Sequence, residues 1–250
     1  MKDILCYGDS NTWGYAPGTG ERFSWERRWP GILQQSLGET FHIIEAGLNG
    51  RTTVFDDPDK AGCNGLTTLG PVLESCPLLA MVILMLGTND LKYHLDVSAF
   101  DTAQGIERLV DLIEADSARA MRKTPQILIV SPPGIDAGSL KSGPLFKGAL
   151  DKLREFPRLF AEVADNKGCH FLDAAQFVNP SRVDGVHLDE RGHIRLAQVI
   201  ARTVIEASGQ AHLLYAKSVS RRSPEPLSWI RRVVALPSLF RSSKKRGNDV

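Results

Sequence analysis

The sequence lacks the patterns of disulfide-bonded, zinc-binding and membrane-spanning proteins. It has four scattered cysteines, with no C-x-x-C pair and no histidine at zinc-ligand spacing: Cys6, Cys63, Cys76 and Cys169. We therefore expect reduced thiols and no metal site. The longest apolar run, residues 77–86, is far shorter than the roughly 20 residues that span a bilayer, so it predicts a buried strand.

A signal peptide and a nucleotide phosphate loop are also missing. The chain passes from Met1 directly into an apolar segment of strand length, without the longer apolar region and small-residue cleavage site of a secretory signal. The glycines at positions 14, 18 and 20 are not followed by Gly-Lys-Ser or Gly-Lys-Thr, so they predict no phosphate cradle. From the scattered cysteines and the lack of a secretory signal we expect a cytoplasmic protein.

Charge is distributed unevenly along the chain. The 250 residues include 30 Lys or Arg and 29 Asp or Glu, a formal net charge of +1. Residues 217–250 alone hold nine basic and two acidic side chains and carry +7, which leaves −6 on residues 1–216. Length and composition predict one large globular domain over residues 1–212 and a basic tail over residues 213–250.

Two interpretations of the tail stay open. Basic pairs flank an apolar stretch from Trp229 to Phe240, which is compatible with a short amphipathic segment that touches an anionic membrane surface or an acidic partner. Pro224, Pro226 and Pro237 argue against a long helix and favour a flexible, solvated tail. We do not expect nucleic-acid binding.

Apolar segments of strand length alternate with segments of helical spacing. The expected strands are continuous apolar runs, as in strands buried on both faces: residues 4–7, 41–45, 79–86, 126–130 and 170–172. Three helices are expected: from Pro30 to a stop at Gly38, around Ala103 to Ile113, and from Asp189 to near Gly209, the last with Ile194 on its apolar face. A fourth segment of helical spacing, residues 150–163, contains Pro157, which should kink or divide it. The alternation predicts a three-layer α/β/α sandwich with a mainly parallel sheet of about five strands, and residues 49–78 and 132–147 should form long loops.

Four short blocks follow predicted strands or lie in the loops after them. They are Gly8-Asp9-Ser10, Gly47, Gly87-Thr88-Asn89-Asp90 and Asp184-Gly185-Val186-His187. Because reactive groups gather beyond the carboxyl ends of parallel strands, we expect these blocks to converge. Ser10, at a strand-to-helix turn, can attack a substrate, and His187 can take its proton while Asp184 holds the other ring nitrogen.

The order of these blocks resembles that of the SGNH, or GDSL-type, hydrolases over residues 1–208. The resemblance implies a flavodoxin-like fold with Ser10 as nucleophile, and with Asp184 and His187 completing a triad. It also implies an oxyanion hole made by the Ser10 amide, the Gly47 backbone and the Asn89 side chain. Residues 8–14, 47–53, 56–58 and 85–90 are similar to the arylesterase and acyltransferase branch, whose members act on small acyl esters. Asn11 replaces the leucine of the GDSL name.

The resemblance implies a serine esterase that hydrolyses short-chain esters through an acyl-serine, without metal or cofactor, and that can transfer acyl groups to alcohols. A carbohydrate O-deacetylase and an inactive SGNH fold used for binding stay open as alternatives. Trp13 is the aromatic residue expected nearest the substrate, and Asp90 is interpreted as structural. Arg51 is expected either to cap its loop through Asp56 or Asp57 or to bind substrate. The long loops suggest a homo-oligomer.

Overall fold

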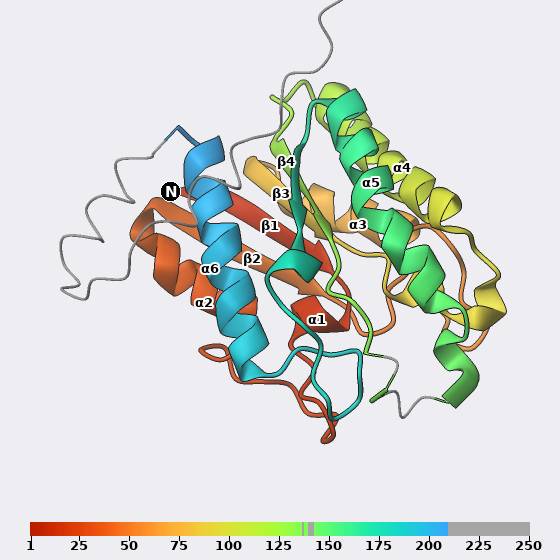
Figure 1. Ribbon diagram of the computed structural model, residues 1–250. Helices are drawn as coiled ribbons and strands as arrows, with labels where there is room; N and C mark the ends of the chain where they lie inside the picture. The colour runs from red at the N-terminus through yellow and green to blue at the C-terminus, as the bar shows by residue number, and fades with distance from the viewer. Residues whose placement is uncertain (137, 140–142, 210–250) are drawn as a thin grey trace, which may run out of the picture. The chain divides into compact units, whose positions relative to one another are not determined.

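The computed structural model describes residues 1–136, 138–139 and 143–209. They form a five-stranded parallel sheet, in the order β2-β1-β3-β4-β5, between two layers of helices (Figure 1). The strands are β1 (Lys2–Gly8), β2 (Phe41–Gly47), β3 (Leu79–Met85), β4 (Gln126–Ser131) and β5 (His170–Asp173). The predicted α/β/α sandwich and its five strand positions are confirmed. The predicted tail, residues 213–250, lies outside the described residues, so its boundary stays a prediction.

The helices divide between the two faces of the sheet. Helices α2 (Trp29–Leu37) and α6 (Glu190–Ala207) pack together on one face, and α3 (Gly65–Ser75), α4 (Ala99–Arg119) and α5 (Ala149–Lys167) cover the other (Figure 1). The short α1 (Ser10–Trp13) follows β1 directly. Single 3-10 turns complete the description: η1 (Gly38–Thr40), η2 (Asn89–Leu91), η3 (Tyr93–Leu95), η4 (Gly143–Phe146) and η5 (Ala174–Gln176). No helix among the described residues has the length and hydropathy needed to cross a membrane.

Strand β1 lies inside the sheet, between β2 and β3, and both β1 and β3 are buried along most of their length. Its residues Ile4 to Tyr7 are all fully buried, as are Val82 to Leu84 of the neighbouring β3. Burying one large apolar side chain contributes about 1.5–3 kcal/mol, so these two strands supply a rigid frame. Both deliver their carboxyl ends to the same edge of the sheet, where the order of the strands reverses and ligands bind in folds of this kind.

Helix α3 occupies part of segment 49–78, which the sequence predicts to be a loop, so that prediction is wrong there. The side chain of Asn64 caps the helix by accepting hydrogen bonds from the amides of Leu66 and Thr67 at 2.9 and 3.3 Å. Leu69 and Leu73, one turn apart, are buried. This cap and this burial stabilise a helix whose glycines and proline give it a low intrinsic propensity.

Helix α5 runs unbroken through Pro157, so the predicted division at this proline does not occur. The rings of Phe156 and Phe160 are buried on either side of the proline and stack with centroids 4.9 Å apart. A proline inside a helix costs about 3 kcal/mol, because it cannot donate the intrahelical hydrogen bond and its ring clashes with the preceding turn. The burial of this aromatic pair offsets that cost.

Helix α6 buries a histidine and exposes an isoleucine that was expected on its apolar face. Ile194 is 40% exposed because the buried stripe of the helix runs beside it, through His193, Ala197 and Ile200. The amide of Trp29 donates to His193 Nδ1 at 3.3 Å, and the ring of Phe23 meets the imidazole edge-on at 5.3 Å. Burial lowers the pKa of His193 to about 4, so the ring is neutral at pH 7.

This buried histidine predicts that the protein loses stability in mild acid. The unfolded chain takes up a proton at His193 near pH 6.5, whereas the folded chain resists protonation until about pH 4. Stability should therefore decline as the pH falls through this window, by about 3 kcal/mol at pH 4. Denaturant unfolding of the wild type and of His193→Gln between pH 4 and 7 measures the effect. An equally steep decline in the variant would contradict the assignment.

Candidate active site

The turn after β1 presents Ser10 at the start of α1. Asp9 caps this short helix, since its side chain accepts a hydrogen bond from the Asn11 amide at 2.9 Å. The amide of Ser10 lies in the first turn, where backbone N–H groups have no partner within the helix. Ser10 is 6% exposed, so its hydroxyl lies in a largely enclosed position.

The structure brings His187 and Asp184 to this serine from the loop before α6. His187 Nε2 lies 2.9 Å from Ser10 Oγ, and His187 Nδ1 lies 2.8 Å from Asp184 Oδ2. The other oxygen of Asp184 accepts the amides of Val186 and His187, both at 3.0 Å. Burial alone would raise the pKa of Asp184, but these hydrogen bonds outweigh it and lower the pKa, so the carboxylate stays charged at neutral pH.

Asn11 fixes the backbone on both sides of His187, a role that the sequence did not reveal. Its Oδ1 accepts the amide of Leu188 at 2.9 Å, and its Nδ2 donates to the carbonyl of Val186 at 3.4 Å. Asn11 directly follows the serine and is almost fully buried. A leucine at this position, as in the GDSL motif, could form neither hydrogen bond.

Tyr15 is a second residue whose position near the site the sequence did not reveal. Its ring stacks on the imidazole of His187 with centroids 4.1 Å apart and an angle of 26° between the planes. The ring of Tyr15 therefore covers one face of the imidazole and restricts its rotation. Tyr15 follows α1, so the same turn supplies the serine, Asn11 and this ring.

Gly47 and Asn89 lie at the ends of the strands that flank β1. Gly47 pairs with Gly8 in the β1–β2 register, and a Cβ at Gly47 would lie 2.2 Å from the Trp13 nitrogen, so only glycine fits beside α1. Asn89 opens η2 after β3, and its Nδ2 donates to the carbonyl of Arg51 at 3.1 Å. The predicted oxyanion donors therefore lie at the end of β2 and in the turn after β3, the two strands that flank β1.

Arg51 does not cap its loop through Asp56 or Asp57, one of the two roles expected from the sequence. Its guanidinium is buried and donates to the carbonyls of Gly8, at 2.8 Å, and Ala46. No hydrogen bond joins it to Asp56 or Asp57 within the described part of the chain, and contact between Arg51 and a substrate stays a prediction.

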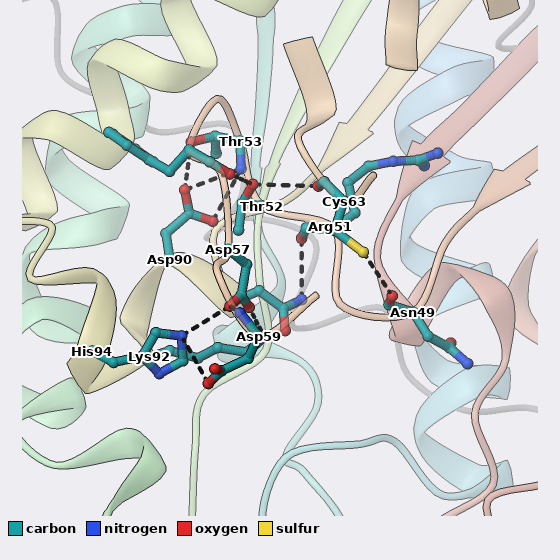
Figure 2. A network of polar contacts seen from close by, with 12 residues as sticks. Asn49, Arg51, Thr52, Thr53, Asp57, Asp59, Cys63, Asp90, Lys92 and His94 are labelled. Atoms are coloured by element: carbon teal, nitrogen blue, oxygen red, sulfur yellow. Dashed lines mark hydrogen bonds and ion pairs between the residues drawn. The ribbon is translucent and has the colours of Figure 1, made fainter. Parts of the chain in front are cut away.

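Two aspartates tie segment 49–64 to the residues after β3 (Figure 2). Asp90 accepts the amide of Thr53 at 3.0 Å and its hydroxyl at 2.5 Å, which gives Asp90 the structural role expected of it. Burial raises the pKa of Asp90 to about 6 against the opposing effect of these hydrogen bonds. Asp57 accepts Lys92 Nζ at 2.6 Å and His94 Nε2 at 3.0 Å.

The cluster around Asp57 is the one group of potential metal ligands found among the described residues. It consists of Asp57, Asp59 and His94. Burial tends to raise the pKa of Asp57, but hydrogen bonds from Lys92 and His94 lower it to about 2. Because the ammonium of Lys92 already compensates the carboxylate of Asp57, the cluster is an internal ion pair that anchors the loop.

Trp13 ends α1, and it is half-buried. The guanidinium of Arg22 lies over its ring at 5.3 Å, and Arg22 Nε donates to its carbonyl at 2.7 Å. Contact between Trp13 and a substrate stays a prediction.

Comparison with known proteins agrees with this geometry. The model of the GDSL-like lipase/acylhydrolase family matches residues 6–195. The aryl esterase of M. smegmatis is 35% identical with a TM-score of 0.79, over 82% of this chain and 99% of its own. Est24, a carbohydrate acetylesterase from Sinorhizobium meliloti, is 34% identical with a TM-score of 0.79, over 83% of this chain and 100% of its own.

A carbohydrate acetylesterase family member from the same organism, Sinorhizobium meliloti, is 37% identical with a TM-score of 0.79, and the match covers 84% of this chain and 100% of that chain. A search among curated protein sequences found no match. The family match covers most of the chain, and these structures align along nearly their entire length. The chain therefore belongs to the GDSL-like lipase/acylhydrolase family and is a hydrolase of the esterase type.

Proposed function

We propose that the protein hydrolyses short-chain carboxylic esters through an acyl-serine intermediate on Ser10. The observation that carries this proposal is the continuous relay from Ser10 Oγ through His187 to Asp184, with contacts of 2.9 and 2.8 Å. Both distances lie within the range that proton transfer requires. All three residues of the relay belong to one chain.

Each group has one task in this reaction. Ser10 Oγ attacks the ester carbonyl carbon while His187 Nε2 takes the hydroxyl proton, and Asp184 stabilises the resulting imidazolium. The amides of Ser10 and Gly47 and the side chain of Asn89 stabilise the tetrahedral oxyanion. As the intermediate collapses, His187 returns the proton to the departing alcohol. Water then attacks the acyl-serine in the same manner, and an alcohol in its place would receive the acyl group.

The similar structures support two kinds of substrate. One is described as an aryl esterase and two as carbohydrate acetylesterases, at nearly equal identity. We propose simple aryl and alkyl esters of short acids as substrates, with O-acetylated carbohydrate as the second candidate. A purified enzyme that hydrolyses acetylated sugars much faster than aryl acetates would favour the second. A fold that serves only for binding predicts neither activity.

Replacing Ser10 by alanine should abolish both turnover and covalent labelling. Hydrolysis of p-nitrophenyl acetate and butyrate should fall by on the order of 10⁶-fold, to the assay background, because the nucleophile and its proton transfer are lost together. A fluorophosphonate probe should label the wild type and leave Ser10→Ala unlabelled. A folded wild type that is inert to both esters and probe would contradict the proposal.

Replacing Asn89 by alanine should remove one oxyanion donor and leave the relay intact. We expect kcat to fall by about 100- to 1000-fold. Fluorophosphonate labelling of Ser10 should continue at a reduced rate, and circular dichroism should show a native fold. Unchanged kcat in this variant would exclude Asn89 from the oxyanion hole.

Replacing Asn11 by leucine should slow catalysis by releasing the His187 loop from the serine turn. Small misplacements of a catalytic group cost up to about 100-fold in rate, so we expect kcat to fall by about 10- to 100-fold with little change in KM. Gln34→Leu is the matched control, because the Gln34 side chain also bridges main-chain groups, at Phe41 and Ile43. The control should keep its kcat. Equal kcat values for both variants and the wild type would contradict the role of Asn11.

A further inference from the structure

Arg51 forms hydrogen bonds with all three segments that carry the proposed oxyanion donors. One nitrogen of its side chain donates to the carbonyl of Gly8, at the start of the serine turn, and to the carbonyl of Ala46. Its own carbonyl accepts the side-chain amide of Asn89 at 3.1 Å. The guanidinium also lies 4.0 Å from the ring centroid of Tyr7 in the buried strand β1. One residue thus joins the ends of β1, β2 and β3.

The bond to Ala46 controls the direction of the neighbouring amide. Because a peptide bond is planar, the carbonyl of Ala46 and the N–H of Gly47 form one rigid unit and point in opposite directions. Fixing the carbonyl on the side of Arg51 therefore fixes the N–H on the other side. A cation that donates to the carbonyl also polarises the peptide unit and makes its N–H a stronger donor.

The hydrogen bond from Asn89 Nδ2 to the carbonyl of Arg51 orients the side-chain amide of Asn89 in a similar way. A primary amide carries two N–H donors on one nitrogen. The carbonyl of Arg51 takes one of them, which sets the rotation of the amide and leaves the other N–H for a substrate oxygen. Asn89 is itself buried, so this orientation persists without solvent contacts.

The burial of the charge is costly, which argues for a function beyond filling space. Arg51 is 5% exposed, and its described hydrogen-bond acceptors are two neutral carbonyls. Its Nε is buried without a partner among the described residues. Burial accordingly lowers the pKa of the guanidinium. A neutral, well-packed side chain would avoid this cost, whereas a cation beside the donors favours a developing oxyanion.

We propose that Arg51 is the positioning residue of the oxyanion hole. Its side chain orients the Gly47 amide through the carbonyl of Ala46, and its main chain orients Asn89. The inference rests on the proposed esterase function and assigns to Arg51 a contribution to transition-state stabilisation, with none to substrate binding.

The test compares Arg51→Met, Arg51→Gln and Arg51→Lys with the wild type. For each variant, kcat and KM are measured with p-nitrophenyl acetate, and affinity is measured for an aryl trifluoromethyl ketone. This ketone accepts Ser10 Oγ at its carbonyl carbon and forms a tetrahedral anion, so its affinity reports on the oxyanion hole. The ¹⁹F resonance of the adduct reports its formation independently of turnover.

We expect Arg51→Met to lower kcat by about 10- to 100-fold, a part of what the loss of a whole donor costs. Affinity for the ketone should fall by a similar factor, and KM should change little. Arg51→Lys should recover much of both losses, because one ammonium can donate to both carbonyls. Arg51→Gln keeps a neutral donor, so its kcat and ketone affinity should lie between those of the methionine and lysine variants. If Arg51→Met does not fold, Arg51→Gln replaces it in the test.

Arg122→Met is the matched control. Arg122 also donates to a main-chain carbonyl, that of Pro77, but before β3 at the opposite edge of the sheet. This variant should lose thermal stability and keep its kcat and ketone affinity. A folded Arg51→Met, or Arg51→Gln in its place, with unchanged kcat and ketone affinity would overturn the proposal, as would equal losses in Arg122→Met. A wild type that neither hydrolyses the ester nor forms the adduct would overturn the esterase function itself.

Discussion

The contact between Ser10 Oγ and His187 Nε2 joins residues 177 positions apart in the chain, and the rest of the site is arranged around it. Different parts of the fold hold the two residues. Ser10 is fixed by the buried strand β1 and by the Asp9 cap, whereas His187 belongs to a loop that precedes α6. Helix α6 packs on α2 across one face of the sheet, and this packing brings the loop toward α1. The contact between Ser10 and His187 is therefore a consequence of the sandwich as a whole.

Short-range contacts then fix the position of His187, which the packing of the helices alone sets only approximately. Asn11 bonds to the main chain on both sides of His187, and Tyr15 covers the face of its ring. Asn11 belongs to the same turn as the proposed nucleophile Ser10, and Tyr15 follows this turn. A shift of the serine turn would therefore carry the supports of the histidine with it, which preserves the 2.9 Å contact under thermal motion better than two independent anchors would.

The sequence allowed the strands and the proposed reactive residues to be predicted, because each depends on local pattern. Continuous apolar runs mark buried parallel strands, and polar blocks after those strands must meet at one edge of the sheet. Helix α3 escaped prediction because its glycines and Pro71 are typical of loops, and its stability comes from Asn64 and from tertiary burial. The proposed role of Arg51 could not be predicted from residue types, since its acceptors are main-chain carbonyls of residues that come together only in the folded chain.

Strand β1 positions every part of the proposed site, either directly or through one other residue. Its carboxyl end leads into the turn that carries Ser10 and Asn11, and through Asn11 it positions His187. The last carbonyl of the strand, at Gly8, holds the guanidinium of Arg51. The proposed nucleophile, base and oxyanion donors are thus all positioned by the buried carboxyl-terminal part of one strand. A substitution in β1 that leaves the protein folded should disturb all three functions together, whereas changes at Asn11 and Arg51 should separate the base from the oxyanion hole.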